Sequence, residues 1–289
     1  MDLPPISRTE PHPDDEPGGE VVARLSDSTL DHLMELALDL ASGAAAIHRR
    51  GITGEVDTKS SATDPVTQVD RDSERLILEG IARARPDDGV LGEEGARRDG
   101  TSGFRWVIDP LDGTVNYLYG FPSHAVSIGV EFGGVPVVGV VHDTALGEVY
   151  RARRGGGAFR DDVPIRPNDV SDPARALVAT GFAYEPRVRR SQAEVLTGVI
   201  DRVRDIRRAG SAAIDMCWTA SGRVDAYYET GPHPWDVTAG LVIVREAGGT
   251  AAYDPVNNRI MASAPGLWAP LGDLLTGSGW SPPGARTTR

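Results

Sequence analysis

The pattern of apolar residues changes near residue 160, and this change constrains the fold more than any other feature of the chain. Between residues 89 and 160, short strand patterns follow one another, and Gly133-Gly134 joins two of them, His124–Phe132 and Val135–His142, as a two-residue hairpin. After residue 160, strands alternate with helical patterns, which is typical of α/β structure. The sequence therefore predicts an antiparallel-rich first half and an α/β second half.

Two helices are predicted before the strands begin. Leu30, Leu33, Ala37 and Leu40 lie on one face of a helix that starts at a Ser28 or Asp27 cap and ends near Gly51. The other predicted elements are a helix at 70–84, strands at 89–92, 104–108, 148–151, 158–160, 176–180 and 224–228, and helices at 187–203, 212–221 and 236–247.

The chain is predicted to contain two subdomains between two tails. Residues 1–27 are rich in Pro, Gly and acidic residues without periodicity, which predicts a disordered acidic tail. Residues 28–160 are predicted to form an N-terminal α+β subdomain and residues 161–275 a C-terminal α/β subdomain. Residues 276–289 resemble the first tail in composition and are predicted to be flexible.

The net charge and the cysteine content limit which classes of partner and which cellular compartment are expected. A formal net charge of −12 argues against a nucleic-acid-binding surface, which is usually basic. No apolar run approaches the ~20 residues that a membrane-spanning helix needs. The single cysteine, Cys217, cannot form an internal disulfide and fits a reducing compartment. We therefore expect a cytoplasmic protein with no nucleic-acid and no membrane partner, and we expect Cys217 to lie in the core.

Four acidic residues stand where a strand or loop passes into the next element. The apolar strand 106–108 leads directly into the second of them, and Pro110 is expected to end the strand pairing there and turn the chain. Gly113 lets the backbone approach a ligand closely. The four acidic residues are Glu93, Asp109, Asp112 and Asp236.

Such carboxylates suggest metal-assisted phosphate chemistry. Converging carboxylates repel one another, so a divalent cation is their natural partner, and Mg²⁺ prefers oxygen ligands. If residues 114–119 form a helical turn, the amides of Gly113 and Thr114 point at an anion. Each motif alone has a simpler interpretation, because Asp-x-x-Asp-Gly is usually a turn and an Asp near a helix start is usually a cap. The hypothesis of a magnesium-dependent phosphatase depends on their conjunction.

Three segments together resemble the signatures of the inositol monophosphatases, which belong to the lithium-inhibited, magnesium-dependent phosphatase superfamily. The segments are Gly92-Glu93-Glu94, residues 106–117 (Trp-Val-Ile-Asp-Pro-Leu-Asp-Gly-Thr-Val-Asn-Tyr) and residues 235–240 (Trp-Asp-Val-Thr-Ala-Gly). Their order and spacing also agree, and the resemblance covers about residues 28–275. It implies a layered α-β-α-β-α sandwich of the inositol monophosphatase and fructose-1,6-bisphosphatase type, a homodimer, and sensitivity to lithium.

The resemblance implies metal ligands residue by residue. One Mg²⁺ would be held by Glu93, Asp109 and the carbonyl of Leu111. A second would be held by Asp109, Asp112 and Asp236, with Asp109 bridging the two ions. A third, weaker ion would again use Glu93. Two to three Mg²⁺ are thus expected at one site.

The resemblance also implies the residues that handle phosphate and water. Gly113 and Thr114 match the phosphate-binding amides, and the Thr114 hydroxyl together with Glu93 would orient the attacking water. Asp70 matches the partner of this catalytic threonine, and Lys59, which is the only lysine in the chain, matches a cation near the phosphate. Water would attack in line, without a phosphoenzyme.

The second half of the chain is expected to select the ester. Gly210 and Ala212 open a helix with small residues that let a sugar-like ring approach the backbone, and Glu229 could accept hydrogen bonds from a polyol. Matching residues contact the inositol ring in the family that the chain resembles. We expect a small-molecule phosphate ester, inositol monophosphate, with breadth toward other polyol phosphates. The alternatives are a histidinol-phosphate or fructose-1,6-bisphosphate phosphatase and, from another class, a regulatory partner of a transcription complex.

Overall fold

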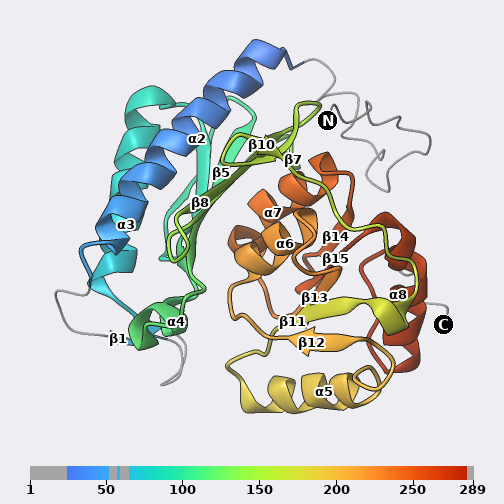
Figure 1. Ribbon diagram of the computed structural model, residues 1–289. Helices are drawn as coiled ribbons and strands as arrows, with labels where there is room; N and C mark the ends of the chain where they lie inside the picture. The colour runs from blue at the N-terminus through green and yellow to red at the C-terminus, as the bar shows by residue number, and fades with distance from the viewer. Residues whose placement is uncertain (1–24, 52–56, 59–64, 285–289) are drawn as a thin grey trace.

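The computed structural model describes residues 25–51, 57–58 and 65–284 of the chain (Figure 1). The predicted acidic tail lies outside these residues except for its last three, and Asp27 already belongs to the first described helix, α2 (Asp27–His48). Ser26 caps that helix by accepting a hydrogen bond from the amide of Thr29, so the predicted cap at Ser28 or Asp27 was wrong by one or two positions.

The larger sheet has eight strands among the described residues, in the order β10-β9-β8-β7-β6-β5-β3-β4. Neighbouring strands are antiparallel except β3 and β5, which are parallel. The strands are β3 (Gly89–Gly92), β4 (Arg97–Arg98), β5 (Phe104–Asp112), β6 (Ala125–Phe132), β7 (Val135–Asp143), β8 (Glu148–Arg153), β9 (Gly157–Arg160) and β10 (Val163–Pro164).

The predicted hairpin is confirmed, but the predicted end of β5 was wrong. Gly133 and Gly134 both have positive φ and join β6 to β7 directly. Strand β5 does not end at Ile108. Its pairing with β6 is interrupted after Asp109 and resumes at Asp112, so that one extra residue is accommodated on β5. Pro110 interrupts the ladder because it has no N–H, and the strand then continues.

The described part of the chain forms a second, five-stranded sheet in the order β12-β11-β13-β15-β14. Strand β11 is parallel to β12 and β13, whereas β15 is antiparallel to β13 and β14. These strands are β11 (Leu177–Thr180), β12 (Asp205–Arg207), β13 (Ala226–Thr230), β14 (Thr250–Asp254) and β15 (Arg259–Ser263), and a separate short pair joins β1 (Asp57–Thr58) to β2 (Pro65–Val66).

Helices and sheets alternate as five layers, which confirms the predicted α-β-α-β-α sandwich (Figure 1). Helices α2 and α3 (Gln68–Ala84) cover one face of the larger sheet, and α6 (Ala212–Ala220) and α7 (Pro234–Glu246) lie between the two sheets. Helices α5 (Pro186–Thr197) and α8 (Trp268–Gly277) flank the outer face of the smaller sheet. The short helices are α4 (Thr114–Tyr119), η1 (Pro173–Arg175) and η2 (Pro265–Leu267).

Alternation along the strands of the smaller sheet divides its side chains between two cores. Tyr227 faces the core that contains α6 and α7, whereas Ala226 and Tyr228 face the core that contains residues of α8. None of the helices in the described ranges is both long and apolar enough to span a membrane.

Helix α7 lies unusually close to the larger sheet. A Cβ at Gly139 would lie 2.3 Å from the carbonyl oxygen of Ala239, and one at Gly129 would lie 2.5 Å from Cγ2 of Thr238. Both glycines therefore permit an approach that any other residue would prevent. These contacts hold the first half of α7, and with it Asp236, against β6 and β7.

Three further expectations are corrected. Helix α5 ends at Thr197 rather than at 203, because the chain turns at Gly198 and then forms β12. No elements were predicted for residues 250–275, which form β14, β15, η2 and most of α8. Residues 276–284 do not form the flexible tail that was predicted, since Trp280 is 4% exposed and its indole N–H donates to Thr230 Oγ1 at 2.8 Å.

Candidate active site

Three carboxylates from two elements meet at one point. Asp109 and Asp112 lie on β5 and Asp236 lies in the first turn of α7. One oxygen atom from each lies within 4.8 Å of the others. Because Asp109 and Asp112 flank the irregular stretch of β5, their carboxylates turn toward the same place instead of following the alternation of a regular strand.

Asp112 is held by the start of α6. Its Oδ2 accepts hydrogen bonds from Ser211 Oγ at 2.7 Å and from the amide of Ala213 at 2.8 Å. Burial raises the pKa of Asp112 to about 6, although the hydrogen bonds from Ser211 and Ala213 act in the opposite direction. The hydrogen bonds orient the carboxylate, but they do not neutralise its charge.

Of the three carboxylates, that of Asp109 belongs to the least exposed residue. Its Oδ1 accepts a hydrogen bond from the amide of Leu111 at 2.9 Å. Burial raises its pKa well above the ordinary value, and the charges of Glu93, Asp112 and Asp236 raise it further. Glu93 follows β3 and is near enough to raise the pKa of Asp109, but within the described residues the group whose oxygens all lie within 4.8 Å of one another contains only Asp109, Asp112 and Asp236.

Asp236 caps its own helix while it faces the other carboxylates. Its Oδ2 accepts a hydrogen bond from the amide of His233 at 2.6 Å. Burial and the charges of Asp112 and Glu93 raise its pKa well above the ordinary value. The imidazole of His233 stacks on Trp235, with ring centroids 4.8 Å apart, which agrees with a packing role for His233.

This donor set fits a hard divalent cation. The converging atoms are carboxylate oxygens, each oriented by its own hydrogen-bond donor, and no cationic side chain is among the atoms that meet there in the described part of the chain. A cation would relieve the mutual repulsion that raises the pKa values. Oxygen ligands of this kind suit Mg²⁺ better than softer metals such as Cu⁺.

Thr114 lies beside the carboxylates and is joined to Asp70. Its Oγ1 is 3.0 Å from Asp70 Oδ1 and 3.0 Å from the carbonyl oxygen of Leu111. Asp70 also caps α3, because its Oδ2 accepts the amide of Thr67 at 2.8 Å. Residues 114–119 form the expected helical turn, and Gly113 precedes it with φ of 89°. Lys59 lies outside the described residues.

The residues predicted to select the ester lie on the α6 side of the carboxylates. Gly210 and Ala212 flank Ser211, the residue that caps α6 and binds Asp112. Glu229 on β13 accepts a hydrogen bond from the Tyr227 hydroxyl at 2.7 Å, and burial raises its pKa to about 7. A Cβ at Gly181 would lie 1.8 Å from Glu229 Oε2, so this glycine leaves room for the carboxylate.

Two charged residues near this end were not predicted. Asp215 is 1% exposed, its Oδ1 has no hydrogen-bond partner within the described residues, and burial raises its pKa well above the ordinary value. The guanidinium of Arg208 lies against Gly210, and its charge lowers the pKa of Asp112, Asp215 and Glu229. In the sequence, Asp215 is one acidic residue in a short helix, and only its burial distinguishes it.

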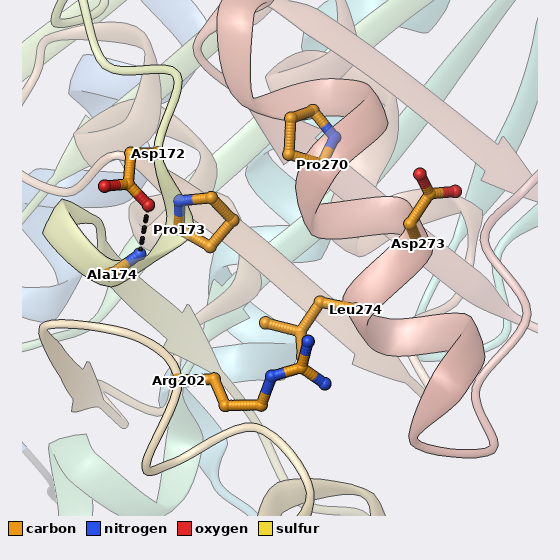
Figure 2. Close-up of a pocket in the computed structure, with 7 residues that line it drawn as sticks. All are labelled: Asp172, Pro173, Ala174, Arg202, Pro270, Asp273 and Leu274. Carbon is orange, nitrogen blue, oxygen red and sulfur yellow. Dashed lines mark hydrogen bonds between the residues drawn. The ribbon is translucent and has the colours of Figure 1, made fainter.

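A separate cavity of about 300 Å³ lies between η1, Arg202 and α8 (Figure 2). Its charged residues, Asp172, Arg202 and Asp273, are exposed, and Asp172 already accepts the amide of Ala174 at 3.0 Å. None of the residues that line this cavity belongs to the carboxylate group.

Comparison with known proteins shows the family of the chain. The sequence profile of the inositol monophosphatase family matches residues 28–265. Inositol-1-monophosphatase SuhB of Mycobacterium tuberculosis is 45% identical over 261 residues, which cover 81% of this chain and 90% of the relative. A solved structure of Mycobacterium tuberculosis SuhB superposes with a TM-score of 0.76 at 42% identity and covers 86% of this chain and 97% of the other.

Two further proteins bear on substrate and role. The solved structure of SaIMPase-II with inositol monophosphate bound has a TM-score of 0.71 at 29% identity and covers 86% of this chain and 95% of that one. Nus factor SuhB of Pasteurella multocida is 39% identical over 225 residues, which cover 76% of this chain and 84% of the relative.

Proposed function

The chain belongs to the inositol monophosphatase family and is a phosphoric monoester hydrolase, and we propose that it hydrolyses inositol monophosphate to inositol and phosphate with Mg²⁺ as its cofactor. The observation that carries the proposal is the convergence of Asp109, Asp112 and Asp236 within 4.8 Å, beside Thr114. A structural role alone would not require like charges to be gathered at such cost.

We assign the ligands of Mg²⁺ as follows. Glu93, Asp109 and the carbonyl oxygen of Leu111 would hold one ion, Asp109, Asp112 and Asp236 a second, and Glu93 a weaker third. When bound, Mg²⁺ would supply positive charge that polarises the ester phosphate and activates water. The hydrogen bonds from the Leu111, Ala213 and His233 amides keep one carboxylate each in place before any ion binds.

Thr114 and Asp70 would orient the attacking water. Both oxygens near Thr114 Oγ1, those of Asp70 and Leu111, are acceptors, so the hydroxyl proton points at one of them. A lone pair of Thr114 is then left to accept a hydrogen bond from water, with Glu93 as the second acceptor. The amides of Gly113 and Thr114 would bind the phosphate, and Lys59 would add positive charge near it.

Gly210, Ala212 and Glu229 would bind the polyol. The Tyr227 hydroxyl occupies one oxygen of Glu229, which leaves the second oxygen for a substrate hydroxyl. Gly210 and Ala212 are both partly exposed, and the Arg208 guanidinium lies against Gly210. Inositol monophosphate is also the compound named in the solved structure of SaIMPase-II. Breadth toward other polyol phosphates follows because most of these contacts would be made by backbone or by one carboxylate.

The test is phosphate release from a panel of esters that includes inositol monophosphate, histidinol phosphate and fructose 1,6-bisphosphate. Each ester is assayed with Mg²⁺, with Mg²⁺ and Li⁺, and with EDTA. We expect hydrolysis that requires Mg²⁺, is inhibited by Li⁺, and has the highest kcat/KM for inositol monophosphate. Absence of metal-dependent hydrolysis of every ester would refute the mechanism, and a higher kcat/KM for histidinol phosphate would refute only the substrate.

The similarity to Nus factor SuhB supports a second candidate function, a regulatory partner of a transcription complex. The two functions are separable with Asp112→Asn. If the regulatory role exists, this variant still binds a purified transcription elongation complex while it releases no phosphate. Absence of binding by both the native protein and the variant would exclude this second role.

A cytoplasmic location and a homodimeric state complete the proposal. Cys217 is the only cysteine in the sequence and is buried. The chain therefore has no internal disulfide that a reducing compartment would break. Light scattering of the purified protein gives its molar mass and thereby tests whether it is a dimer.

A further inference from the structure

The peptide group between Pro110 and Leu111 is held at both of its polar atoms. The carbonyl oxygen of Pro110 lies 2.9 Å from Nε2 of His48, and the amide of Leu111 donates to Asp109 Oδ1 at 2.9 Å. These two atoms belong to one rigid plane. Any rotation of the plane that breaks one hydrogen bond therefore also disturbs the other, so His48 and the Asp109 carboxylate are mechanically linked.

The hydrogen bonds determine the tautomer of His48. A carbonyl oxygen only accepts, so Nε2 carries the hydrogen. Nδ1 lies 3.0 Å from Thr144 Oγ1, and burial lowers the pKa of His48 to about 3, so the neutral ring accepts the threonine hydroxyl proton at Nδ1. Nδ1 of His124 lies 2.7 Å from the same Oγ1, and the His124 carbonyl oxygen, 3.2 Å away, is a second acceptor for the Thr144 hydroxyl proton. Thr144 thus connects the His48 ring to His124.

Neighbouring groups keep the His48 ring in place. His48 is 3% exposed at the end of α2, and its own carbonyl accepts a hydrogen bond from the Tyr117 hydroxyl at 2.6 Å. The Tyr117 ring meets the His124 ring edge-on at 5.1 Å between centroids. The His48 ring itself lies near the rings of Tyr117 and His124, with centroids 5.8 and 6.4 Å away, and it is therefore restrained by α4, by the residue before β6 and, through Thr144, by the residue after β7.

We propose that His48 is a positioning residue of the metal site, which holds the Pro110–Leu111 peptide and thereby fixes the orientation of the Asp109 carboxylate toward Asp112 and Asp236. The proposal rests on the proposed function, because Asp109 is there the ligand shared by two ions. Without His48 the buried Pro110 carbonyl loses the side-chain donor that it has within the described residues, and the peptide gains freedom to turn. Partners that orient a metal ligand typically change metal affinity or activity 10–100-fold when removed.

Three substitutions separate the two hydrogen bonds of the ring. His48→Gln places an amide donor near the position of Nε2 and keeps the bond to Pro110, His48→Asn reaches only toward Thr144, and His48→Leu keeps neither. Two quantities are measured on the full chain: the Mg²⁺ concentration for half-maximal hydrolysis of inositol monophosphate, and the Mg²⁺ concentration for half-saturation of the site, fitted from the dependence of Tm on Mg²⁺. The second readout needs no turnover.

We expect the Asn and Leu variants to raise both Mg²⁺ midpoints about 10-fold or more, with an unchanged KM for the ester at saturating Mg²⁺. The Gln variant restores midpoints close to those of the native protein. Leu33→Ala, a core substitution in the same helix, is the control: it lowers Tm without Mg²⁺ and leaves both midpoints unchanged.

Midpoints of His48→Leu equal to those of the native protein would overturn the proposal, as would a Gln variant as impaired as the Asn variant. The Gln and Asn pair decides the question even if the Leu variant does not fold. If the native protein shows neither Mg²⁺-dependent hydrolysis nor a Mg²⁺-dependent Tm, the proposed function has failed instead, which is a separate result.

Discussion

At the scale of single residues, hydrogen bonds fix the orientation of the carboxylates in the site but do not neutralise their negative charge. Asp112 accepts two hydrogen bonds from the start of α6, and its pKa is nevertheless raised to about 6 from 3.8. A carboxyl group whose pKa is higher in the folded state binds more protons there than in the unfolded chain between these two values. The contribution of Asp112 to stability without metal must therefore fall as the pH rises through this interval, whereas the lowered pKa of His48 acts in the opposite direction.

The stability of the metal-free native protein relative to the metal-free Asp112→Asn variant should accordingly fall between pH 3.8 and about 6, the two pKa values of Asp112. The expected change in this difference is about 2–3 kcal/mol of unfolding free energy. Urea unfolding of both proteins in EDTA at a series of pH values measures it, and the comparison removes the opposite pH dependence of His48, which both proteins share. A difference that does not change with pH would contradict the assignment.

Substitution of Asp112 by Asn should separate activity from folding. The amide keeps an oxygen that can accept from Ser211 and Ala213 but loses the negative charge, so phosphate release should fall by at least about 100-fold while Tm without metal stays the same or rises. Asp273→Asn, in the separate cavity of Figure 2, is the matched control and should retain native activity. Equal activity of the two variants would refute the role of Asp112.

Glu229 should make substrate binding depend on pH. Its pKa is raised to about 7, and only the ionised form accepts hydrogen bonds at both oxygens. The KM for inositol monophosphate should therefore fall as the pH rises through about 7. In Glu229→Gln the KM should be raised about 10-fold, with this pH dependence lost and kcat affected less. An unchanged pH profile of KM in the variant would argue against contact with the polyol.

The sequence could identify charged ligands but not the groups that hold them. Glu93, Asp109, Asp112 and Asp236 stand out because acidic residues at element ends are unusual in otherwise apolar surroundings. His48 and Asp215 lie in helices with no unusual sequence pattern. The role of His48 depends on its hydrogen bond to Pro110, which is 62 residues away in the sequence, and Asp215 is distinguished only by its burial. Such long-range pairings leave no local pattern.

At the scale of elements, the position of α7 depends on two glycines of the sheet beneath it. Gly139→Ala should destabilise the protein by about 1–3 kcal/mol, because the added Cβ would meet the Ala239 carbonyl. The same displacement moves the start of α7, so the Mg²⁺ midpoint should rise as well. Gly277→Ala, whose Cβ meets nothing within 4 Å, is the control and should change stability by less than about 1 kcal/mol. Equal unfolding midpoints in urea would contradict the close packing.

Elements with a strong local signal were predictable and the others were not. The Gly133-Gly134 hairpin follows from the backbone freedom of glycine. The continuation of β5 past Pro110 could not be predicted, because it depends on the partner strand resuming its pairing at Ala125. Strands β14 and β15 contain several small residues, and their pairing with each other and with β13 gives them their place.

At the scale of the whole molecule, the last described residues close the outermost core. Trp280 packs edge-on against Tyr228 at 5.5 Å between centroids and donates to Thr230. Trp280→Ala should therefore cost about 3–5 kcal/mol, measured by chemical denaturation, whereas Val256→Ala at an 88% exposed site should cost less than about 0.5 kcal/mol. A small effect at Trp280 would instead support the prediction that this segment is a flexible tail.

The middle layer also has a consequence for synthesis of the protein. Val141 and Tyr150 of the larger sheet pack in the core formed with α6 and α7, yet those helices come at residues 212–246. A ribosome releases the amino-terminal strands first, so this sheet emerges with one apolar face bare while residues 165–211 are still being made. The nascent chain must spend that interval either shielded by a chaperone or at risk of sticking to its neighbours.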